Sequence, residues 1–541
     1  MHMMTLGRQS STGRQVQTLF RETYIGWTLR SLGVTHIFSY SDEECQGIPE
    51  KDYIPADSDQ DSDSTKAENP FLVRFVPEYD LGNPRHWPLG VKIIVTAIIN
   101  LVTVACYMGA SLWSASTEGF KEALGISTTV ANSGTSLYLF GLAIGGMLFS
   151  PICELPQVGK THVYIPALTA YLLCLLPILL SDSIVVILVF RFITGFLASP
   201  TVSLGGASVA DVWEARNLGP PMIIYDGATA FATFIGPVMG NWAAQLAPGE
   251  SYRWPMWINF WFSAIALIAC FFFLPETSPS TILHWRASRI RMKTGDDRYH
   301  TKGEVGVAKR TTGAWMERLF VKPITLNFKE PIVLVLNSYL ALVYALLFAA
   351  LESFRIVYVD IYGFTPGQEG LTFIAPFVGF VLSQAIYFAW YQKYQEPEFE
   401  QGTMKPERRL LPAFCAAFTI PIGLFWFGWS AQAKVHPAMP IIGGAFLGPS
   451  TLCLFAATLN YLPDAYPEVA STVLAGSNFT RCALAGIFPF FITPLYKAIG
   501  PGWASSIWAL VGVIFMPAPF VIYRSGAWLR AKSPNATKDF V

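Results

Sequence analysis

Hydrophobic residues in this chain fall into long runs with few charges, rather than into the alternating or helical stripes of a soluble fold. Twelve such runs approach the length of about 20 residues that a helix needs to cross the hydrocarbon core of a bilayer. They cover residues 91–113, 128–152, 162–180, 184–207, 219–246, 254–274, 331–358, 367–391, 411–430, 437–462, 469–496 and 503–523. The pattern predicts an all-α membrane protein with twelve transmembrane helices.

Two polar stretches divide the chain into domains. Residues 1–82 contain the run DSDQDSDST, which cannot bury enough apolar surface to offset its ordering entropy. Residues 275–330 separate six predicted spans from the next six, and their cations at helical spacing indicate either an amphipathic helix on the anionic inner leaflet or a solvated linker. The expected domains are a disordered cytoplasmic tail (1–82), a six-helix half (83–274), a cytoplasmic linker (275–330), a second six-helix half (331–523) and a cytoplasmic tail (524–541).

The distribution of positive charge predicts the orientation. With residues 1–82 in the cytoplasm, 29 Lys and Arg residues lie on that side of the membrane and four lie on the opposite side. Such an excess is typical of cytoplasmic loops. Because the number of spans is even, both termini are expected in the cytoplasm, and we expect a plasma-membrane location, with the vacuolar membrane as the alternative.

Composition excludes several classes of protein. With 52% hydrophobic residues, 14% charged residues and a mean hydropathy of +0.40, the chain is not an ordinary soluble enzyme. Lys and Arg number 37, and so do Asp and Glu, so no net charge favours nucleic acid as a partner. The eight cysteines are scattered without a CxxC pair, which indicates core residues rather than disulfides or a zinc site. No HExxH, GxxxxGK(S/T) or GxSxG pattern occurs, so we expect no enzyme, no ATP-driven transport, no cofactor and no metal.

Short motifs in both halves point to one family. In the first half they are Asn83–Pro88 (NPRHWP), Arg191–Gly195 (RFITG) followed by Gly205–Asp211 (GGASVAD), and Leu274–Thr277 (LPET). In the second half they are Pro406–Leu410 (PERRL), Gly423–Trp429 (GLFWFGW), Asn460–Leu462 with Asp464, and Phe488–Phe491 (FPFF). In the order and spacing of these motifs the chain resembles the fungal drug:proton antiporters of the major facilitator superfamily, in the group of the benomyl, methotrexate and fluconazole resistance transporters of yeasts. The resemblance implies two six-helix halves around a midplane site, a monomer in the lipid bilayer, and exchange of protons for a small molecule by alternating access.

The loop between the second and third spans carries Glu154, Gly159 and Lys160. Gly159 permits a tight turn, and Lys160 can neutralise Glu154 or Asp211, which lies at the base of the fourth span. In similar transporters, such residues bridge helix ends in the outward-open state, so the resemblance implies a gating role. The alternative is an ordinary turn with solvated charges.

Arg191 is the strongest single candidate for function. It lies on the order of 10 Å below the outer end of the fourth span, where a charge costs roughly 2.5–3.5 kcal/mol even on a lenient insertion scale. In similar antiporters the arginine at this position takes part in proton coupling. The alternative is an arginine that snorkels to the interface or clamps helices through their carbonyls.

Two acids inside the spans are candidate proton carriers. Asp226 lies near the inner end of the fifth span, whereas Glu352 is level with Arg191, so Glu352 is predicted to be its partner. However, Arg355 follows Glu352 by three residues on the same helix face, and an ion pair within the helix is the alternative. Related sequences typically have proline where Arg355 stands.

The end of the fifth span resembles the antiporter motif, through Gly236, Pro237 and Gly240. Glycine and proline there predict close helix packing and a kink. The match is partial, because Asn241 replaces a second glycine, and Thr233 and Phe234 stand where relatives usually have Gly and Pro.

Aromatic and polar residues within the spans are candidates to line a substrate cavity, although most such residues pack helices or face lipid. The candidates are Tyr107, Phe231, Phe354, Tyr358, Asn478 and Arg481, with Trp426 and Trp429 as further aromatics. Well inside the bilayer the spans supply two acids and three arginines, and two of these arginines have plausible local partners. A mostly apolar cavity for neutral planar compounds is therefore expected. We therefore expect a proton-coupled exporter of hydrophobic or amphipathic small molecules. The alternatives are an organic-acid or polyamine transporter, and a membrane scaffold or sensor that has lost transport.

Overall fold

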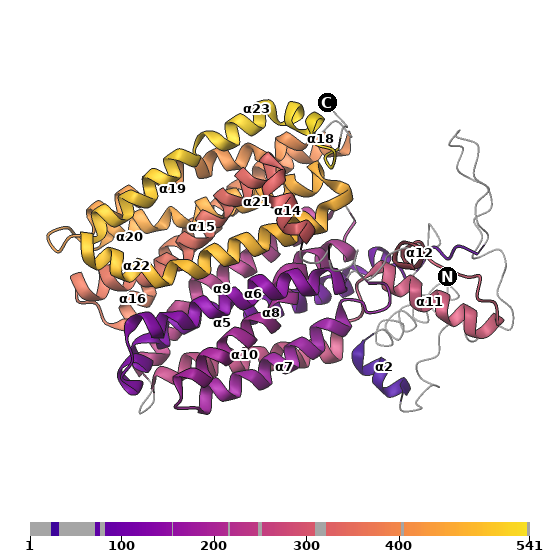
Figure 1. Ribbon diagram of the computed structural model, residues 1–541, viewed down its shortest axis with the longest axis horizontal. Helices are drawn as coiled ribbons and strands as arrows, with labels where there is room; N and C mark the ends of the chain where they lie inside the picture. The colour runs from indigo at the N-terminus through magenta and orange to yellow at the C-terminus, as the bar shows by residue number, and fades with distance from the viewer. Residues whose placement is uncertain are drawn as a thin grey trace, which may run out of the picture.

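Two helical bundles lie side by side in the computed structural model, which describes residues 23–31, 71–75, 80, 82–153, 155–214, 217–246, 251–308, 317, 321–401 and 405–537. The first bundle lies below the second in Figure 1. Its helices are α5 (Leu89–Leu124), α6 (Thr128–Cys153), α7 (Thr161–Leu180), α8 (Ile184–Val212), α9 (Gly219–Leu246) and α10 (Trp254–Phe273).

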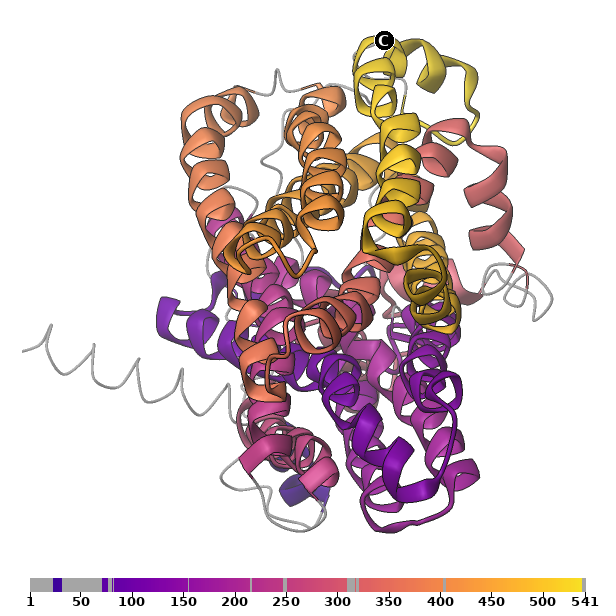
Figure 2. The ribbon, with the colours of Figure 1, turned by 90° about the vertical axis from the view of Figure 1, so that its left-hand side faces the viewer.

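The second bundle repeats this plan with more interruptions. Its helices are α15 (Pro331–Arg355), the π-helix Ile356–Ile361, α16 (Pro366–Thr372), α17 (Ile374–Trp390), α19 (Leu411–Ser430), α20 (Ala438–Ala445), α21 (Leu447–Ala465), α22 (Ala470–Phe515) and α23 (Pro517–Lys532). Figure 2 shows the two bundles end-on, from the side where α16 lies. We call this side the outer end, after the orientation predicted from the positive charges, and the opposite side, which carries α11, the inner end (Figure 1).

The last two spans are fused into one helical stretch. By length and composition, 11 helices of the described chain can cross a membrane, and one of these, Ala470–Lys532, has 63 residues. At 1.5 Å per residue such a helix would measure about 95 Å, roughly twice the full thickness of a bilayer. Gly500 has non-helical backbone angles (φ 77°, ψ 161°) and precedes Pro501, so the chain turns there and crosses again. The prediction of an all-α fold with two six-helix halves is confirmed.

Helix α5 extends well beyond the predicted end of its span. The sequence 91–113 is apolar, whereas residues 114–124 (SASTEGFKEAL) are polar but good helix formers, and the helix continues until Gly125 adopts a left-handed conformation (φ 62°). Hydropathy therefore located the membrane segment correctly but missed about three further turns of the helix. This extension carries Glu118 toward the second bundle.

The described part of the segment between the bundles, residues 275–308, 317 and 321–330, is largely helical. It contains α11 (Pro279–Thr294), α12 (Lys302–Ala308) and α14 (Lys322–Lys329). Arg286 of α11 forms a bidentate ion pair with Asp80 at 2.6 and 2.8 Å, and Ala287 and Ile290 pack on Val73. Part of the basic charge of α11 is therefore used within the protein and does not face a lipid leaflet or water.

Part of the N-terminal stretch that was expected to be disordered is a helix. Tyr24–Ser31 forms α2, and the Tyr24 ring packs on Phe271 of α10 at a centroid distance of 5.5 Å. Burial of aromatic area offsets the ordering entropy of this short piece. The polar run at 57–65 lies outside the described residues.

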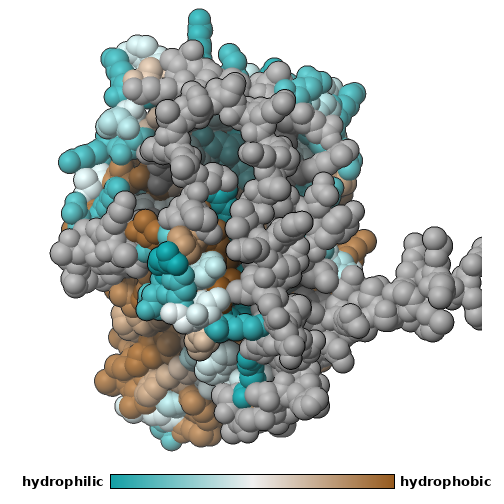
Figure 3. Space-filling view, turned by 90° about the vertical axis from the view of Figure 1, so that its right-hand side faces the viewer, coloured by the Kyte–Doolittle hydropathy of each residue, from teal (hydrophilic) through white to brown (hydrophobic). Residues whose placement is uncertain are grey.

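Large apolar side chains remain exposed along the sides of the bundles, among them Leu180, Val185, Leu382, Ile386 and Ile514. Figure 3 shows the inner end, where hydrophilic residues gather above while hydrophobic residues occupy the side of the molecule below. An apolar belt with polar ends is what a bilayer requires of a multi-pass protein.

Candidate functional site

Glu352 lies where the two bundles meet near the outer end. Its side chain belongs to α15 and is only 7% exposed, and its Oε2 accepts a hydrogen bond of 2.8 Å from Nδ2 of Asn132 in α6. The same Nδ2 is 3.3 Å from Oγ1 of Thr493 in α22. The acid is therefore held by a contact between the bundles. Sequence analysis missed Asn132, because an asparagine at the start of an apolar run carries no signal of its own.

Arg355 pairs with the first bundle and not with Glu352. Its Nη2 is 3.5 Å from Oε2 of Glu118 in α5, and Glu118 also binds Lys121 at 2.7 Å. The ion pair within the helix that was considered as the alternative for Glu352 is absent among the described ion pairs. The reason is the extension of α5, which offers Arg355 a carboxylate that is not buried.

A second buried acid, Glu369, lies in α16 at the same end. It is 3% exposed, and its Oε2 is 3.4 Å from Nδ2 of Asn241 in α9. Beside it, the Gly367 backbone N–H donates to Oε1 of Gln245 at 2.7 Å. Asn241, which departs from the antiporter motif, is thus a contact of the second bundle. Sequence analysis missed Glu369, because the residue stands at the very start of the predicted span 367–391, and only Asp226 and Glu352 were predicted to lie well inside the bilayer.

The antiporter motif itself packs α9 against α5. A Cβ on Gly240 would be 2.8 Å from Cβ of Ala115, and the Ser111 hydroxyl, which lies against Gly236, donates to the Ala232 carbonyl at 2.8 Å. Pro237 is buried within the helix. The glycines therefore allow two helix backbones to approach closely, as the motif predicts.

Arg191 is fully buried within the first bundle. Its Nε donates to the Gly134 carbonyl at 3.1 Å and its Nη1 donates to the Gly109 carbonyl at 2.8 Å. The guanidinium also lies over the rings of Trp113 and Tyr138, at 4.8 and 4.6 Å from their centroids. No ion pair joins it to Glu352 in the part of the chain that the structure covers. The arrangement is the helix clamp that sequence analysis considered as the alternative.

A polar cluster spans the bundles at mid-depth. Asn478 donates to the Ser203 hydroxyl at 3.3 Å and accepts from Nη2 of Arg481 at 2.8 Å. The Arg481 guanidinium lies 4.9 Å from the Tyr344 ring centroid and 5.1 Å from that of Phe455. The charges of both Arg481 and Asp226 act on the buried Tyr107 hydroxyl. Asp226 is half-buried, and its carboxyl has no hydrogen bond or ion pair with any described residue.

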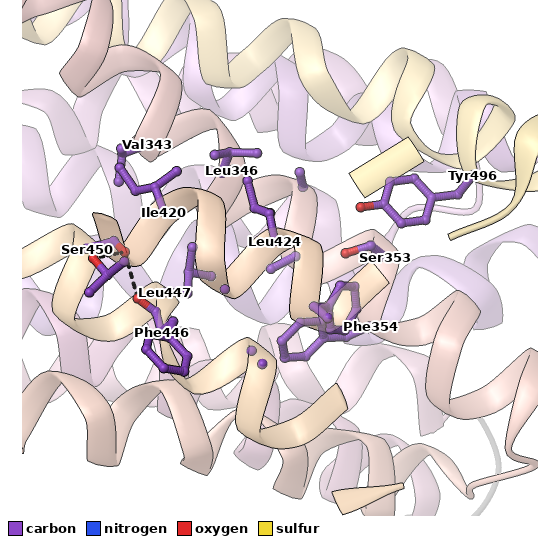
Figure 4. A pocket seen from close by; sticks show the side chains of 17 residues that line it. Val343, Leu346, Ser353, Phe354, Ile420, Leu424, Phe446, Leu447, Ser450 and Tyr496 are labelled. Carbon is purple, nitrogen blue, oxygen red and sulfur yellow. Dashed lines mark hydrogen bonds between the residues drawn. The ribbon is translucent and has the colours of Figure 1, made fainter. Parts of the chain in front are cut away.

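The remaining candidates for the cavity lie elsewhere. Phe354 lines a pocket of about 40 Å³ between α15, α19, α20, α21 and α22, whose lining is mostly apolar (Figure 4). Such a volume holds about two or three water molecules and no organic substrate. Tyr358 packs on Phe354 at 5.4 Å, and Phe231 lies against Phe377 of α17 at 6.0 Å. Of the predicted set, Tyr107, Asn478 and Arg481 come together in the polar cluster, whereas Phe354 and Tyr358 form a separate pair.

The inner end contains a network around the loop that precedes α7. Nζ of Lys160 is 2.5 Å from Oδ2 of Asp211, so Lys160 pairs with the base of α8. The fully buried carboxylate of Glu276 accepts hydrogen bonds from the backbone N–H groups of Lys160, Thr161 and Ser278 at 3.1, 3.0 and 2.9 Å. An anion at a helix N-terminus satisfies N–H groups that have no partner within the helix. Glu154 lies outside the described residues.

Glu276 was not singled out from the sequence, where it appeared only within the motif LPET. Gly159 adopts φ 77°, and a Cβ there would lie 2.6 Å from Oε2 of Glu276. The signal that could have identified Glu276 is an acid directly after a span, at the end where cations prevail.

Replacement of Gly159 by alanine is expected to destabilise the folded protein by more than the roughly 1–2 kcal/mol of left-handed backbone strain, because the new methyl group also displaces Glu276. Thermal unfolding of the purified protein measures this effect. Gly125→Ala is the matched control, since Gly125 also has positive φ (62°) but has open space around its Cα. Equal losses in the two variants would show that the Glu276 contact contributes nothing.

Comparison with known proteins agrees with the fold. The sequence matches the profile of the Major Facilitator Superfamily over residues 99–489. "Transporter mfs1" of Schizosaccharomyces pombe is 34% identical over 92% of this chain and 94% of its own length. "Multidrug transporter FLR2" of Candida glabrata is 33% identical over 88% of this chain and 81% of its own length. "Fluconazole resistance protein 1" of Saccharomyces cerevisiae is 31% identical over 91% of this chain and 90% of its own length.

Among solved structures, the xylose transporter XylE from E. coli, in a partially occluded inward-open conformation, has a TM-score of 0.56 at 14% identity, over 80% of this chain and 99% of that one. This likeness concerns the fold alone. The resemblance to fungal drug-resistance transporters, predicted from the motifs, is confirmed by the relatives. The chain is therefore a membrane transporter rather than an enzyme, and it belongs to the Major Facilitator Superfamily.

Proposed function

We propose that this transporter exports hydrophobic or amphipathic small molecules across the plasma membrane in exchange for protons. The observation that carries the proposal is the contact between Glu352 and Asn132, which buries a carboxyl group between the two bundles. A charge buried beside neutral groups, the Asn132 amide and the Thr493 hydroxyl, is costly, and the nearby cation Arg355 is paired with Glu118. Protonation of Glu352 therefore favours this contact. When the bundles separate at the outer end, water reaches the carboxyl group and the cost disappears. Proton binding and closure of the outer end are thereby coupled.

In this mechanism Arg191 acts on Glu352 indirectly. Arg191 binds the carbonyl of Gly134, and Trp113 donates from Nε1 to the carbonyl of Ala131 at 2.9 Å. These two contacts fix the stretch of α6 that presents Asn132 to Glu352. Arg191 is therefore a positioning residue for the proton site, and this role agrees both with its burial and with the function implied by the resemblance.

The inner network is proposed to support gating at the inner end by holding the first bundle together. The Lys160–Asp211 ion pair and the Glu276 cap tie the start of α7 to the ends of α8 and α10. These contacts lie within the first bundle, so they stabilise it as one body while the second bundle moves against it. Asp226, which lies on the inner part of α9, is proposed as a secondary proton group.

The central cluster supports a neutral or amphipathic substrate. The charge of Arg481 is compensated by Asn478 and by two aromatic rings, and Asp226 is the one acid whose charge also acts on Tyr107 among the described residues. A polycation would need several acids, and a dianion would need an arginine without such partners. The names of two relatives, a multidrug transporter and a fluconazole resistance protein, also support a drug-like substrate.

A growth assay tests this function. Expression in a drug-sensitive yeast is expected to raise tolerance to at least one neutral aromatic toxin, and to lower the accumulation of a fluorescent substrate, without changing tolerance to spermine. Cells that carry the empty vector are the control. Resistance to spermine alone would indicate a polyamine transporter, and unchanged accumulation of every compound in the panel would indicate a scaffold or sensor.

Both termini are proposed to lie in the cytoplasm. An epitope inserted beside Asp296, in the exposed turn after α11, is then expected to bind antibody only after cells are permeabilised. An epitope inserted beside the exposed Lys434, between α19 and α20, should bind antibody on intact cells. The opposite pattern would reverse the orientation and with it the assignment of outer and inner ends.

A further inference from the structure

We propose that Glu369 is a second proton-binding carboxyl of the outer end, and that its protonation helps to close α16 of the second bundle onto α9 of the first. The inference rests on the proposed proton coupling and adds to it a residue that no sequence motif indicates. It implies that closure of the outer end takes up two protons, one at Glu352 and one at Glu369.

The surroundings of Glu369 suit an uncharged carboxyl group. The side chain is 3% exposed, and the amide of Asn241, at 3.4 Å, is its one hydrogen-bond partner among the described residues. Its backbone groups bind elsewhere, since its N–H donates to the Thr365 carbonyl and its carbonyl accepts from Oγ1 of Thr372. An ionised carboxylate with one long hydrogen bond in such a place would be strongly destabilising.

Glu369 is buried where the two bundles touch. A Cβ on the neighbouring Gly370 would lie 3.1 Å from both the Pro237 carbonyl oxygen and Cβ of Asn241, so α16 rests directly on the backbone of α9. The hydrogen bond from Gly367 to Gln245 holds the start of the same short helix. Separation of α16 from α9 would therefore bring water to the carboxyl group. The proton affinity of Glu369 is then higher when the outer end is closed than when it is open.

Some of the charges around Glu369 favour its ionised form and others favour its protonated form. On the second bundle, α15 contributes Glu352 and Arg355, and the π-helix that follows contributes Asp360. The sequence of α17 has no charged residue. On the first bundle, α9 contributes the amides of Asn241 and Gln245 near Glu369. The single acid of α9, Asp226, lies near the inner end. Arg355 favours the ionised form, but it is shared with Glu118. Two neighbouring acids and burial favour the protonated form, so closure is expected to increase as the pH falls.

Spin-label distances between the bundles test this inference without any substrate. Leu246→Cys at the end of α9 and Lys434→Cys between α19 and α20 place labels on exposed positions of the two bundles. The full chain, in lipid nanodiscs and without Cys45, Cys174 and Cys415, is measured as the pH falls from about 7.5 to about 5. The closed population is expected to rise with acidity. Glu369→Gln should make this transition shallower and move it to higher pH, whereas Glu369→Asp should keep a titration close to that of the parent.

Matched variants separate this inference from the proposed function. Glu122→Gln, which neutralises an exposed acid of α5 at the same end, should titrate as the parent does, and the double variant Glu352→Gln/Glu369→Gln should stay closed throughout. A parent-like titration of Glu369→Gln would overturn the inference even if Glu352→Gln alters the curve. An altered curve for Glu369→Gln beside a parent-like curve for Glu352→Gln would support the inference and would contradict the assignment of Glu352. If Glu369→Gln does not fold, a loss of the pH response in Glu369→Asp would overturn it.

Discussion

Glutamine in place of Glu352 is expected to abolish the dependence of efflux on external acidity while leaving the protein folded. Glutamine has the shape of the protonated acid, and its carbonyl oxygen can still accept the hydrogen bond from Asn132. The outer end then closes without a proton, so a pH gradient no longer drives the cycle. Efflux of a fluorescent substrate, measured at two external pH values in cells or proteoliposomes, should lose its acid stimulation by at least about tenfold, the equivalent of roughly 1.4 kcal/mol of coupling.

Two further substitutions rank the candidate proton groups. Asp226→Asn is expected to reduce acid stimulation less, because Asp226 is half-buried on the inner part of α9 and its carboxyl has no hydrogen bond or ion pair with any described residue of the second bundle. Glu122→Gln, on the exposed outer end of α5, should leave it unchanged. If Asp226→Asn abolished the acid stimulation and Glu352→Gln preserved it, Asp226 would be the main carrier and the contact with Asn132 would be structural only.

The fold could be predicted from the sequence because a bilayer imposes a length and a polarity on every crossing. Two features of the helices were not predicted. Residues 114–124 form helix outside the apolar run, and residues 367–391 are divided at Phe373 into α16 and α17. The hydropathy pattern reveals neither feature, yet together they place Glu118 and Glu369 at the contact between the bundles.

The candidate site could be predicted only in part, for a geometric reason. Position along a span gives the depth of a residue but not the direction in which its side chain points. Arg191 and Glu352 are similar in predicted depth, yet Arg191 points into the first bundle toward Gly109 and Gly134. Asn132 and Glu369 are ordinary in the sequence and acquire significance only through partners more than 100 residues away.

Alanine in place of Arg191 is expected to produce the largest loss of stability of any substitution considered. It removes two hydrogen bonds from a charged group, each worth about 1.5–3 kcal/mol, and leaves a cavity between Trp113 and Tyr138. A loss of at least about 3 kcal/mol should appear as a lower thermal midpoint and a smaller yield of folded protein. An unchanged midpoint would show that the carbonyl contacts contribute little.

Lysine at position 191 separates stability from coupling. It keeps the charge but has one ammonium group, which cannot bind the Gly109 and Gly134 carbonyls in the fixed geometry of a guanidinium or stack on two rings. We expect Arg191→Lys to fold with an intermediate thermal midpoint. Because the stretch of α6 that carries Asn132 is then held less firmly, its efflux should also depend less steeply on external pH than that of the parent. If Arg191→Lys showed a reduced midpoint with an unchanged pH profile, Arg191 would stabilise the first bundle without positioning the proton site, and the link through Gly134 and Asn132 to Glu352 would be wrong.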